Sequence, residues 1–142
     1  KRNILSERDC GQGEYENWFA FGRTQSLEKV KHKLFFPHLA AKTPNYIINS
    51  DENLLFYNGL ALLAQSHDEL KVIKKIMESK IFWFYVKNTS KPYTSGYFSF
   101  SSNYIRNFGI CKLDKAETDY VLKEHDKEIL DAFFEKKYGV EI

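Results

Sequence analysis

Residues 66–77, SHDELKVIKKIM, divide the 142-residue chain into two parts of different character. The apolar side chains of this stretch recur at the spacing of one helix face, which predicts an amphipathic helix. They are Leu70, Ile73, Ile76 and Met77. Ser66 and Glu69 have the spacing of a capping box, so we expect the helix to begin there. Short strand-like runs precede this helix, and helical patterns dominate after it.

The strand-like runs lie mainly in the first half of the chain. They are the aromatic run 15–21, closed by Gly22, the run 34–36, stopped by Pro37, and the run 45–49. Two further runs, 54–57 and 60–64, flank Asn58-Gly59, a dipeptide typical of the tight turn between paired strands. The sequence therefore predicts a β-hairpin around this dipeptide.

The second half contains one ambiguous segment and a helical tail. Residues 81–86, IFWFYV, fit either a strand or a buried helix. A short strand is expected at 97–100. From about Lys115 the pattern is helical, and Gly139 predicts the end of the tail helix. Strands followed by helices predict an α+β fold, with a small mixed or antiparallel sheet packed against helices.

The composition predicts one folded domain with a substantial core. The chain is 43% hydrophobic and contains 12 Phe, 9 Tyr and 2 Trp, which excludes disordered, collagen-like and disulfide-framework proteins. We assign six aromatic side chains to the core, namely Trp18, Phe35, Phe36, Phe82, Trp83 and Phe98. Residues 1–13 are polar and predict a linker or the edge of an excised domain, and residues 14–142 are expected to form the domain. The chain starts at Lys1 and its only methionine is Met77, so we expect a piece of a longer protein or a processed product.

The charge is distributed unevenly along the chain. The net charge of +2 is too small to indicate nucleic-acid binding. Residues 114–142, however, carry a net charge of −4, and the first 113 residues carry +6. A basic body with an acidic tail is compatible with a surface that faces phosphates. It is equally compatible with ordinary solvated charge on a helical tail.

The cysteines and the apolar runs indicate the compartment. Cys10 and Cys111 are far apart and belong to no CxxC motif, which is typical of a reduced intracellular protein. The longest apolar run, 81–86, is much shorter than a membrane span, and no signal peptide precedes the domain. We expect a cytoplasmic protein that has no membrane partner.

No motif for catalysis stands out in the sequence. Glycine-rich phosphate loops, zinc-ligand spacings and the nucleophile motif GxSxG are absent. Three Glu-x-Lys triplets, of the kind seen in metal-dependent nucleases, occur at 69–71, 78–80 and 135–137. Such triplets arise by chance in a chain rich in charged residues and suit helix surfaces. A small metal nuclease that uses Glu78 and Lys80 stays an alternative.

Polar side chains suited to nucleic-acid binding occur in three predicted loops. Arg23, Gln25 and Ser26 follow the first aromatic run, and Arg and Gln can make bidentate contacts with base edges. The second loop contains Lys42 and Thr43. The third, 88–96, contains Lys91, Tyr93 and Thr94, and lysines and hydroxyls suit phosphate oxygens. The same side chains could simply be solvated.

Several segments occur in a characteristic order along the chain. They are FGRTQSL at 21–27, KLFFP at 33–37, SKIFWFYVK at 79–87, GYFSF at 96–100 and Tyr104-Ile105. This order resembles the C-terminal specificity domain of TaqI-like DNA adenine methyltransferases, a family that includes fused restriction–modification enzymes of the Eco57I type. The family exit Phe-Pro-Ile corresponds to NFGI at 107–110, where Gly109 replaces the proline. The resemblance extends from about Tyr15 to Ile142.

The resemblance implies a non-catalytic target recognition domain of a type II restriction–modification enzyme. Such a domain reads double-stranded DNA while a separate N-terminal domain methylates the N6 atom of adenine. The Asn-Pro-Pro-[Tyr/Phe] motif of that catalytic domain is absent from this chain, so no cofactor is expected here and S-adenosylmethionine is expected in the catalytic domain. The parent enzyme could also carry an endonuclease domain. The resemblance also favours a helix for residues 81–86.

The resemblance makes the polar loop residues candidate DNA contacts. The ten candidates are Arg23, Gln25, Ser26, Lys29, Lys42, Thr43, Lys91, Tyr93, Thr94 and Arg106. Arg23 and Gln25 would read bases in the major groove, whereas the lysines and Arg106 would contact phosphates. An alternative is a protein-interaction module, which an exposed apolar patch without a basic groove would favour.

Overall fold

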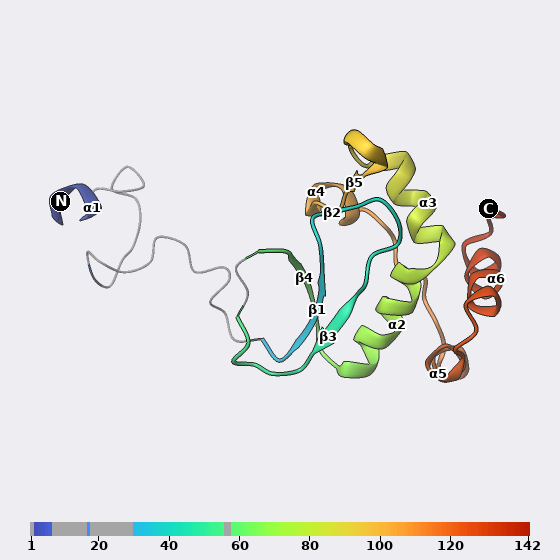
Figure 1. Cartoon of the computed structure of the whole chain (residues 1–142). Helices are drawn as coiled ribbons and strands as arrows, with labels where there is room; N and C mark the ends of the chain where they lie inside the picture. Colours follow the sequence, from blue (N-terminus) through green and yellow to red (C-terminus); the bar gives the residue numbers. More distant parts are fainter. Residues whose placement is uncertain (1, 7–16, 18–29, 56–57) are drawn as a thin grey trace.

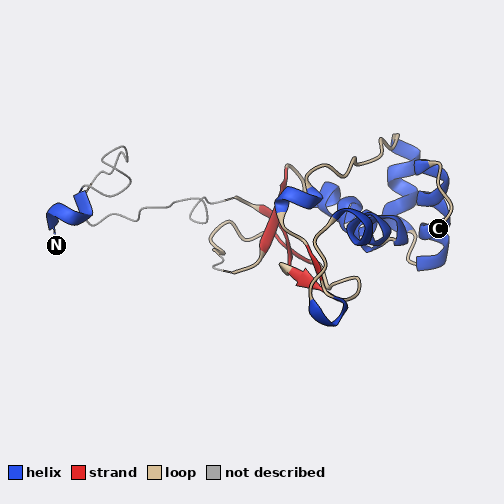
Figure 2. Cartoon of the chain, turned by 90° about the horizontal axis from the view of Figure 1, so that it is seen from above, coloured by secondary structure: helices blue, strands red, loops and turns tan. Residues whose placement is uncertain are grey.

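The computed structural model describes residues 2–6, 17, 30–55 and 58–142, and these form an α+β fold (Figures 1 and 2). In chain order the elements are α1 (Arg2–Ser6), β1 (His32–Phe36), β2 (Leu39–Ala40), β3 (Ile47–Asn49), β4 (Leu60–Ala64), α2 (His67–Glu78), α3 (Lys80–Thr89), the 3-10 helix η2 (Thr94–Gly96), β5 (Phe98–Ser99), α4 (Ser102–Ile105), α5 (Lys115–Lys123) and α6 (Lys127–Tyr138). The predicted fold class is confirmed, since the strands lie mainly in the first half and the helices later. The short helix α1 lies within residues 1–13, where we expected a linker.

Two small antiparallel sheets form the β part. The larger sheet has the order β3-β1-β4, with Leu34 of β1 opposite Ile48 and Leu62. The smaller sheet pairs β2 with β5, so that Leu39 lies opposite Ser99 and Ala40 opposite Phe98. The second sheet therefore joins a segment before α2 to a segment after α3.

The predicted hairpin around Asn58-Gly59 is wrong. Strand β4 pairs with β1, and Leu54 and Leu55 belong to no strand, while residues 56 and 57 lie outside the described residues. Gly59 has a φ of 123°, a backbone conformation that favours glycine, so the dipeptide does mark a turn. The apolar residues of β4 find their partners on β1 because that pairing buries them against the core.

Helices α2 and α3 follow one another with a single serine between them. The Ser66 side chain accepts a hydrogen bond from the Glu69 N–H and caps α2, as predicted. Ser79 ends α2 by donating its N–H to the Ile76 carbonyl, and its hydroxyl oxygen caps the start of α3. Residues 81–86 therefore belong to a helix.

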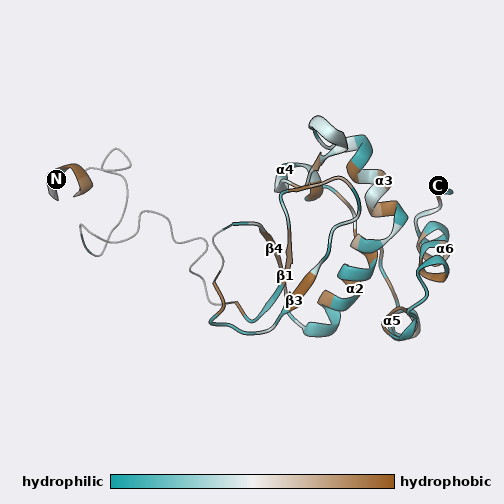
Figure 3. Cartoon of the chain, viewed as in Figure 1, coloured by the Kyte–Doolittle hydropathy of each residue, from teal (hydrophilic) through white to brown (hydrophobic). Residues whose placement is uncertain are grey.

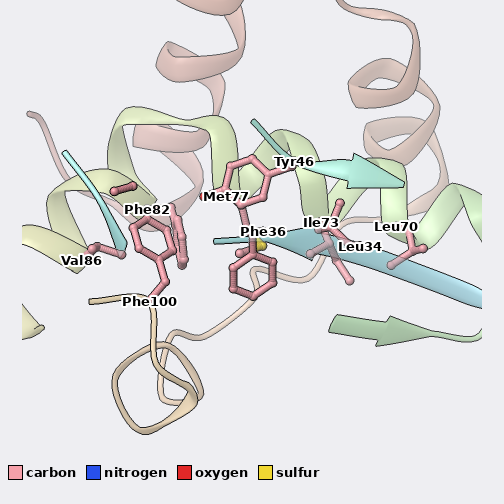
Figure 4. Packing of buried hydrophobic residues seen from close by; sticks show 10 residues of the cluster. Leu34, Phe36, Tyr46, Leu70, Ile73, Met77, Phe82, Val86 and Phe100 are labelled. Atoms are coloured by element: carbon pink, nitrogen blue, oxygen red, sulfur yellow. The ribbon is translucent and has the colours of Figure 1, made fainter. Parts of the chain in front are cut away.

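One face of the larger sheet packs against α2 and α3 to form the first apolar cluster (Figure 4). Leu34 and Phe36 of β1 lie in the same buried cluster as Ile73 and Met77 of α2. Phe100 closes the far end of this cluster, where its ring lies 6.3 Å from Phe36 and 6.2 Å from Phe82 between ring centroids.

The predicted aromatic core is confirmed for two of its six members. Phe36 and Phe82 are buried, whereas Trp83 and Phe98 are half-buried and pack edge to face at its margin, 5.8 Å apart. Phe35 is half-buried because it lies on the sheet face away from α2. Trp18 lies outside the described residues.

A second apolar cluster joins α2 and α3 to the C-terminal helices. Its buried members are Ile76, Ile81, Val121, Leu130 and Phe134. The molecule therefore has three layers, with α2 and α3 between the sheet and the pair α5–α6 (Figure 1). Along α2, α5 and α6 hydrophobic and hydrophilic residues alternate in the manner of amphipathic helices (Figure 3). Helix α6 ends at Gly139, whose φ of 67° matches its predicted role as terminator.

The opposite face of the sheet is partly open. Ile47 of β3 is 63% exposed and Leu63 of β4 is 51% exposed. Lys33 lies between these strands on β1 and is only 2% exposed, and its ammonium group donates to the Asp51 carbonyl at 2.8 Å. This hydrogen bond attaches the turn after β3 to the central strand and compensates for burying a charged group.

Candidate nucleic-acid interface

The β2–β5 sheet brings two distant polar segments to one end of the molecule. Phe100 donates its N–H to the His38 carbonyl at 2.8 Å, which extends the ladder beyond Leu39 and Ser99. On its other side β5 contacts the chain just after α3, where Ser99 donates to the Lys91 carbonyl at 3.1 Å. The loops that begin at residues 41 and 91 therefore start from one small rigid ladder.

The second of these loops is a tight exposed turn. The Tyr93 N–H donates to the Tyr97 carbonyl at 2.7 Å, and Ser95 and Gly96 both have positive φ, 62° and 75°. The left-handed conformation suits Gly96 and is uncommon for serine, so the turn has a specific shape. The Lys91 ammonium lies 5.3 Å from the centroid of the Tyr93 ring. The structure thus places three candidates, Lys91, Tyr93 and Thr94, side by side in one exposed turn.

The first loop separates its two candidates. Lys42 is exposed and follows the end of β2. Thr43 is half-buried and lines a cavity that also contacts α2 and α6.

Arg106 is positioned by α4. The Tyr85 hydroxyl of α3 donates to the Tyr104 carbonyl at 2.9 Å and attaches the short helix to the core. Arg106 caps the end of α4 and is exposed, and its guanidinium makes no ion pair with the described residues. It can therefore reach an anion without first losing an intramolecular partner.

The other four candidates lie outside the described residues. They are Arg23, Gln25, Ser26 and Lys29. These include both side chains expected to read bases, so six of the ten candidates lie within the described residues.

The two segments that form the smaller sheet carry charge of one sign. Residues 30–50, which contain β2, include three lysines and neither Asp nor Glu. Residues 79–113, which contain α3, β5 and α4, include five cationic residues and likewise no acid. The two segments that meet at the ladder therefore contain cationic residues and no acidic ones, whereas α5 and α6 carry the acidic tail.

Sequence reasoning missed a polar cavity on another part of the molecule. A cavity of about 360 Å³ lies between the end of α2, the start of α3, the α5–α6 junction and residues 43–45. Asp131 of α6 faces it and is 2% exposed. The available signal was its spacing, because Asp131 lies three residues before Phe134 on the apolar side of the helix.

Burial also raises the pKa of a tyrosine near this cavity, Tyr46. Tyr46 is buried in the first cluster, and its hydroxyl has no hydrogen-bond partner among the described residues. Burial raises the pKa of Tyr46 well above its usual range, and the nearby Glu78 carboxylate raises it further. The phenol is therefore neutral at physiological pH.

The described residues offer no metal centre. No three His, Cys, Asp or Glu side chains within these ranges lie close enough together to hold a metal ion. Glu78, a residue of the nuclease alternative, has its carboxylate 3.8 Å from the Lys74 ammonium. Within the described ranges, no helix combines the length and apolar character of a membrane span.

Comparison with known proteins gives no assignment of function, so the residues of the chain are the basis for one. No protein-family model matches the chain, and no curated protein sequence matches it significantly.

Proposed function

We propose that this chain is a double-stranded DNA recognition domain, the non-catalytic specificity domain of a type II restriction–modification adenine-N6 methyltransferase. The observation that carries the proposal is that two segments without acidic residues pair in the β2–β5 ladder, and that the loops following them present the exposed cations Lys42 and Lys91. The order of the motifs, which resembles that of TaqI-like specificity domains, supports the same function. The S-adenosylmethionine-dependent domain of the parent protein would be its partner inside a prokaryotic cell.

The residues divide by the part of DNA that each would contact. Lys42, Lys91 and Arg106 suit phosphate oxygens, since each presents an exposed cation. Tyr93 offers a half-exposed ring for a sugar or base, and Thr94 a hydroxyl for phosphate. Arg23 and Gln25 would supply base readout. The domain alone should bind weakly, because the catalytic domain would form the other wall of the DNA cleft.

The proposal can be tested by titrating duplex DNA against the chain at several salt concentrations. We expect Lys42→Ala and Lys91→Ala each to weaken binding and to reduce the slope of log affinity against log salt by about 0.9, the value for one phosphate contact. Arg23→Ala should also relax sequence preference, once the preferred site has been selected from a random duplex pool.

Lys71→Ala is the matched control. Lys71 is an exposed lysine of α2 that pairs with Asp68 at 2.9 Å, so the substitution removes the same charge from another surface. If the wild type and the four variants all show the same affinity and the same salt slope, the proposed interface is wrong.

A protein-interaction module is the second candidate function, and the open face of the larger sheet favours it. Ile47, Leu54, Leu55 and Leu63 are exposed, and an apolar hollow of about 480 Å³ lies beside the first three. Exposed apolar clusters of this kind are typical of interfaces. Sedimentation velocity over a concentration series tests it, because self-association reversed by Leu63→Lys would show that this face binds protein.

A further inference from the structure

Asp131 lines the cavity described above, and one of its carboxylate oxygens lacks a donor among the described residues. The Asp131 Oδ1 atom accepts a hydrogen bond from the Lys80 N–H at 2.8 Å, at the start of α3. Its Oδ2 atom is buried and has no partner among the described residues. Buried polar atoms are almost always hydrogen-bonded, to protein, to ordered water or to a ligand, so this oxygen can accept one further hydrogen bond.

Lys75, one of the two lysines that line the cavity, cannot supply that donor. The Lys75 ammonium donates to the backbone carbonyls of Val121 at 2.6 Å, Leu122 at 3.1 Å and Glu124 at 2.5 Å. An ammonium group has three N–H donors, and these three carbonyls occupy all of them. The Lys75 ammonium is therefore fully used in binding the end of α5 and forms no ion pair with Asp131.

The charge of the cavity indicates the sign of its ligand. Three carboxylates line it, those of Glu78, Glu124 and Asp131. Two cations line it as well, but Lys75 is already committed and Lys127 lies exposed in the first turn of α6. An anionic ligand such as phosphate would meet net negative charge here, whereas a cation with N–H donors would not.

We propose that this cavity binds an alkylammonium or guanidinium group, which donates a hydrogen bond to Asp131 Oδ2. Charge-assisted N–H···O bonds to a carboxylate are among the strongest polar contacts, and Arg and Lys side chains or small amines present this group. Thr43 of the loop after β2 also lines this cavity, so binding is measured in the absence of DNA.

The test is a titration of the 142-residue chain, followed by amide NMR shifts of Lys80 and Asp131. One arm uses N-acetylarginine amide, which represents a protein side chain, and the other uses 1,4-diaminobutane, which represents a free amine. Saturable shifts at both amides in at least one arm are expected. The arm that binds more tightly identifies the source of the group.

Asp131→Asn is the decisive variant because it keeps the Oδ1 acceptor for Lys80 and replaces Oδ2 by an amide donor. We expect it to bind the better probe at least about tenfold more weakly. Asp68→Asn, at an exposed carboxylate in the first turn of α2, should bind as the wild type does. If Asp131→Asn is unfolded by circular dichroism, Glu78→Gln replaces it, with a smaller loss of affinity expected. No saturation with either probe, or equal binding by the wild type and the cavity variant, would overturn the proposal.

Discussion

The two apolar clusters of this molecule are built differently. The first contains ten buried side chains and fixes the sheet, α2 and α3 around Phe100. The second has five, and it attaches α5 and α6 to the outer side of the same helices. Phe108 packs against both clusters and lies between them. The smaller cluster has less apolar area to hold its helices, so polar contacts should matter more there.

Three polar contacts reinforce the smaller cluster. Lys75 binds the last carbonyls of α5, and Asp131 of α6 binds the first free N–H of α3. The Tyr138 hydroxyl donates to the Gly109 carbonyl at 2.9 Å and accepts from the Cys111 N–H at 3.1 Å. Each contact joins residues more than 25 positions apart, so these contacts hold α5 and α6 against the rest of the fold.

The largest expected effect comes from truncating the central phenylalanine of each cluster, which tests whether the two clusters stabilise different parts of the fold. Phe100 and Phe134 are both fully buried, and Phe→Ala in a core costs about 3–5 kcal/mol. We expect Phe100→Ala to lower the midpoint of the whole unfolding transition. Phe134→Ala should release α5 and α6 while β1, α2 and α3 keep their amide protection.

Thermal unfolding together with hydrogen–deuterium exchange distinguishes these outcomes. Equal loss of protection across all elements in both variants would show that the two clusters form one cooperative unit.

Lys75→Met should have the next largest effect. The methionine keeps the aliphatic stem but loses the hydrogen bonds to the end of α5, and loss of such bonds to a charged donor costs about 1.5–3 kcal/mol. Partial burial of its ammonium lowers the pKa of Lys75. Urea unfolding measures the change. Lys74→Met is the control, because Lys74 only approaches Glu78 at 3.8 Å, and an effect as large would contradict the role of Lys75.

The smallest effect concerns a surface ion pair between α5 and α6. Glu117 lies 2.5 Å from Lys137, and this hydrogen bond holds the pKa of Glu117 below its ordinary value of 4.5. A lowered carboxylate pKa contributes stability that is present above 4.5 and is lost as the pH falls through the lower folded value. We therefore expect Glu117→Gln, which keeps the capping acceptor, to have a smaller free energy of unfolding than the wild type in urea at pH 7. At pH 2 the difference should vanish, and its persistence there would show that the charge is not its source.

Local signals predicted the helices well and the strand pairing poorly. The Ser66 cap and the apolar spacing of α2 depend on neighbours within four residues, so they are visible in the sequence. The partner of β4 is set by burial against α2, which joins Leu34 to Leu62 across 28 positions. The Asn58-Gly59 signal reports backbone conformation alone, and it was therefore right about the turn and wrong about the hairpin.

The part of the candidate site that lies in polar loops was predictable, because polar loop residues are usually exposed. Lys91, Tyr93 and Thr94 were expected in a polar loop and do lie in one exposed turn. Thr43 and Asp131 could not be placed, since their surroundings are made by helices that approach from distant parts of the chain. The sequence pattern around a polar residue in an amphipathic helix is the same whether that residue faces solvent or a cavity.

The position of Phe100 along the chain has a consequence for synthesis on the ribosome. The strands β1, β3 and β4 and helix α2 are complete by residue 78, so the sheet can form early in translation. The ring that closes their cluster emerges more than 20 residues later, together with the β5 strand that holds β2. A nascent chain halted between these points would expose the inner face of its sheet, and this interval is where a chaperone would have most to protect.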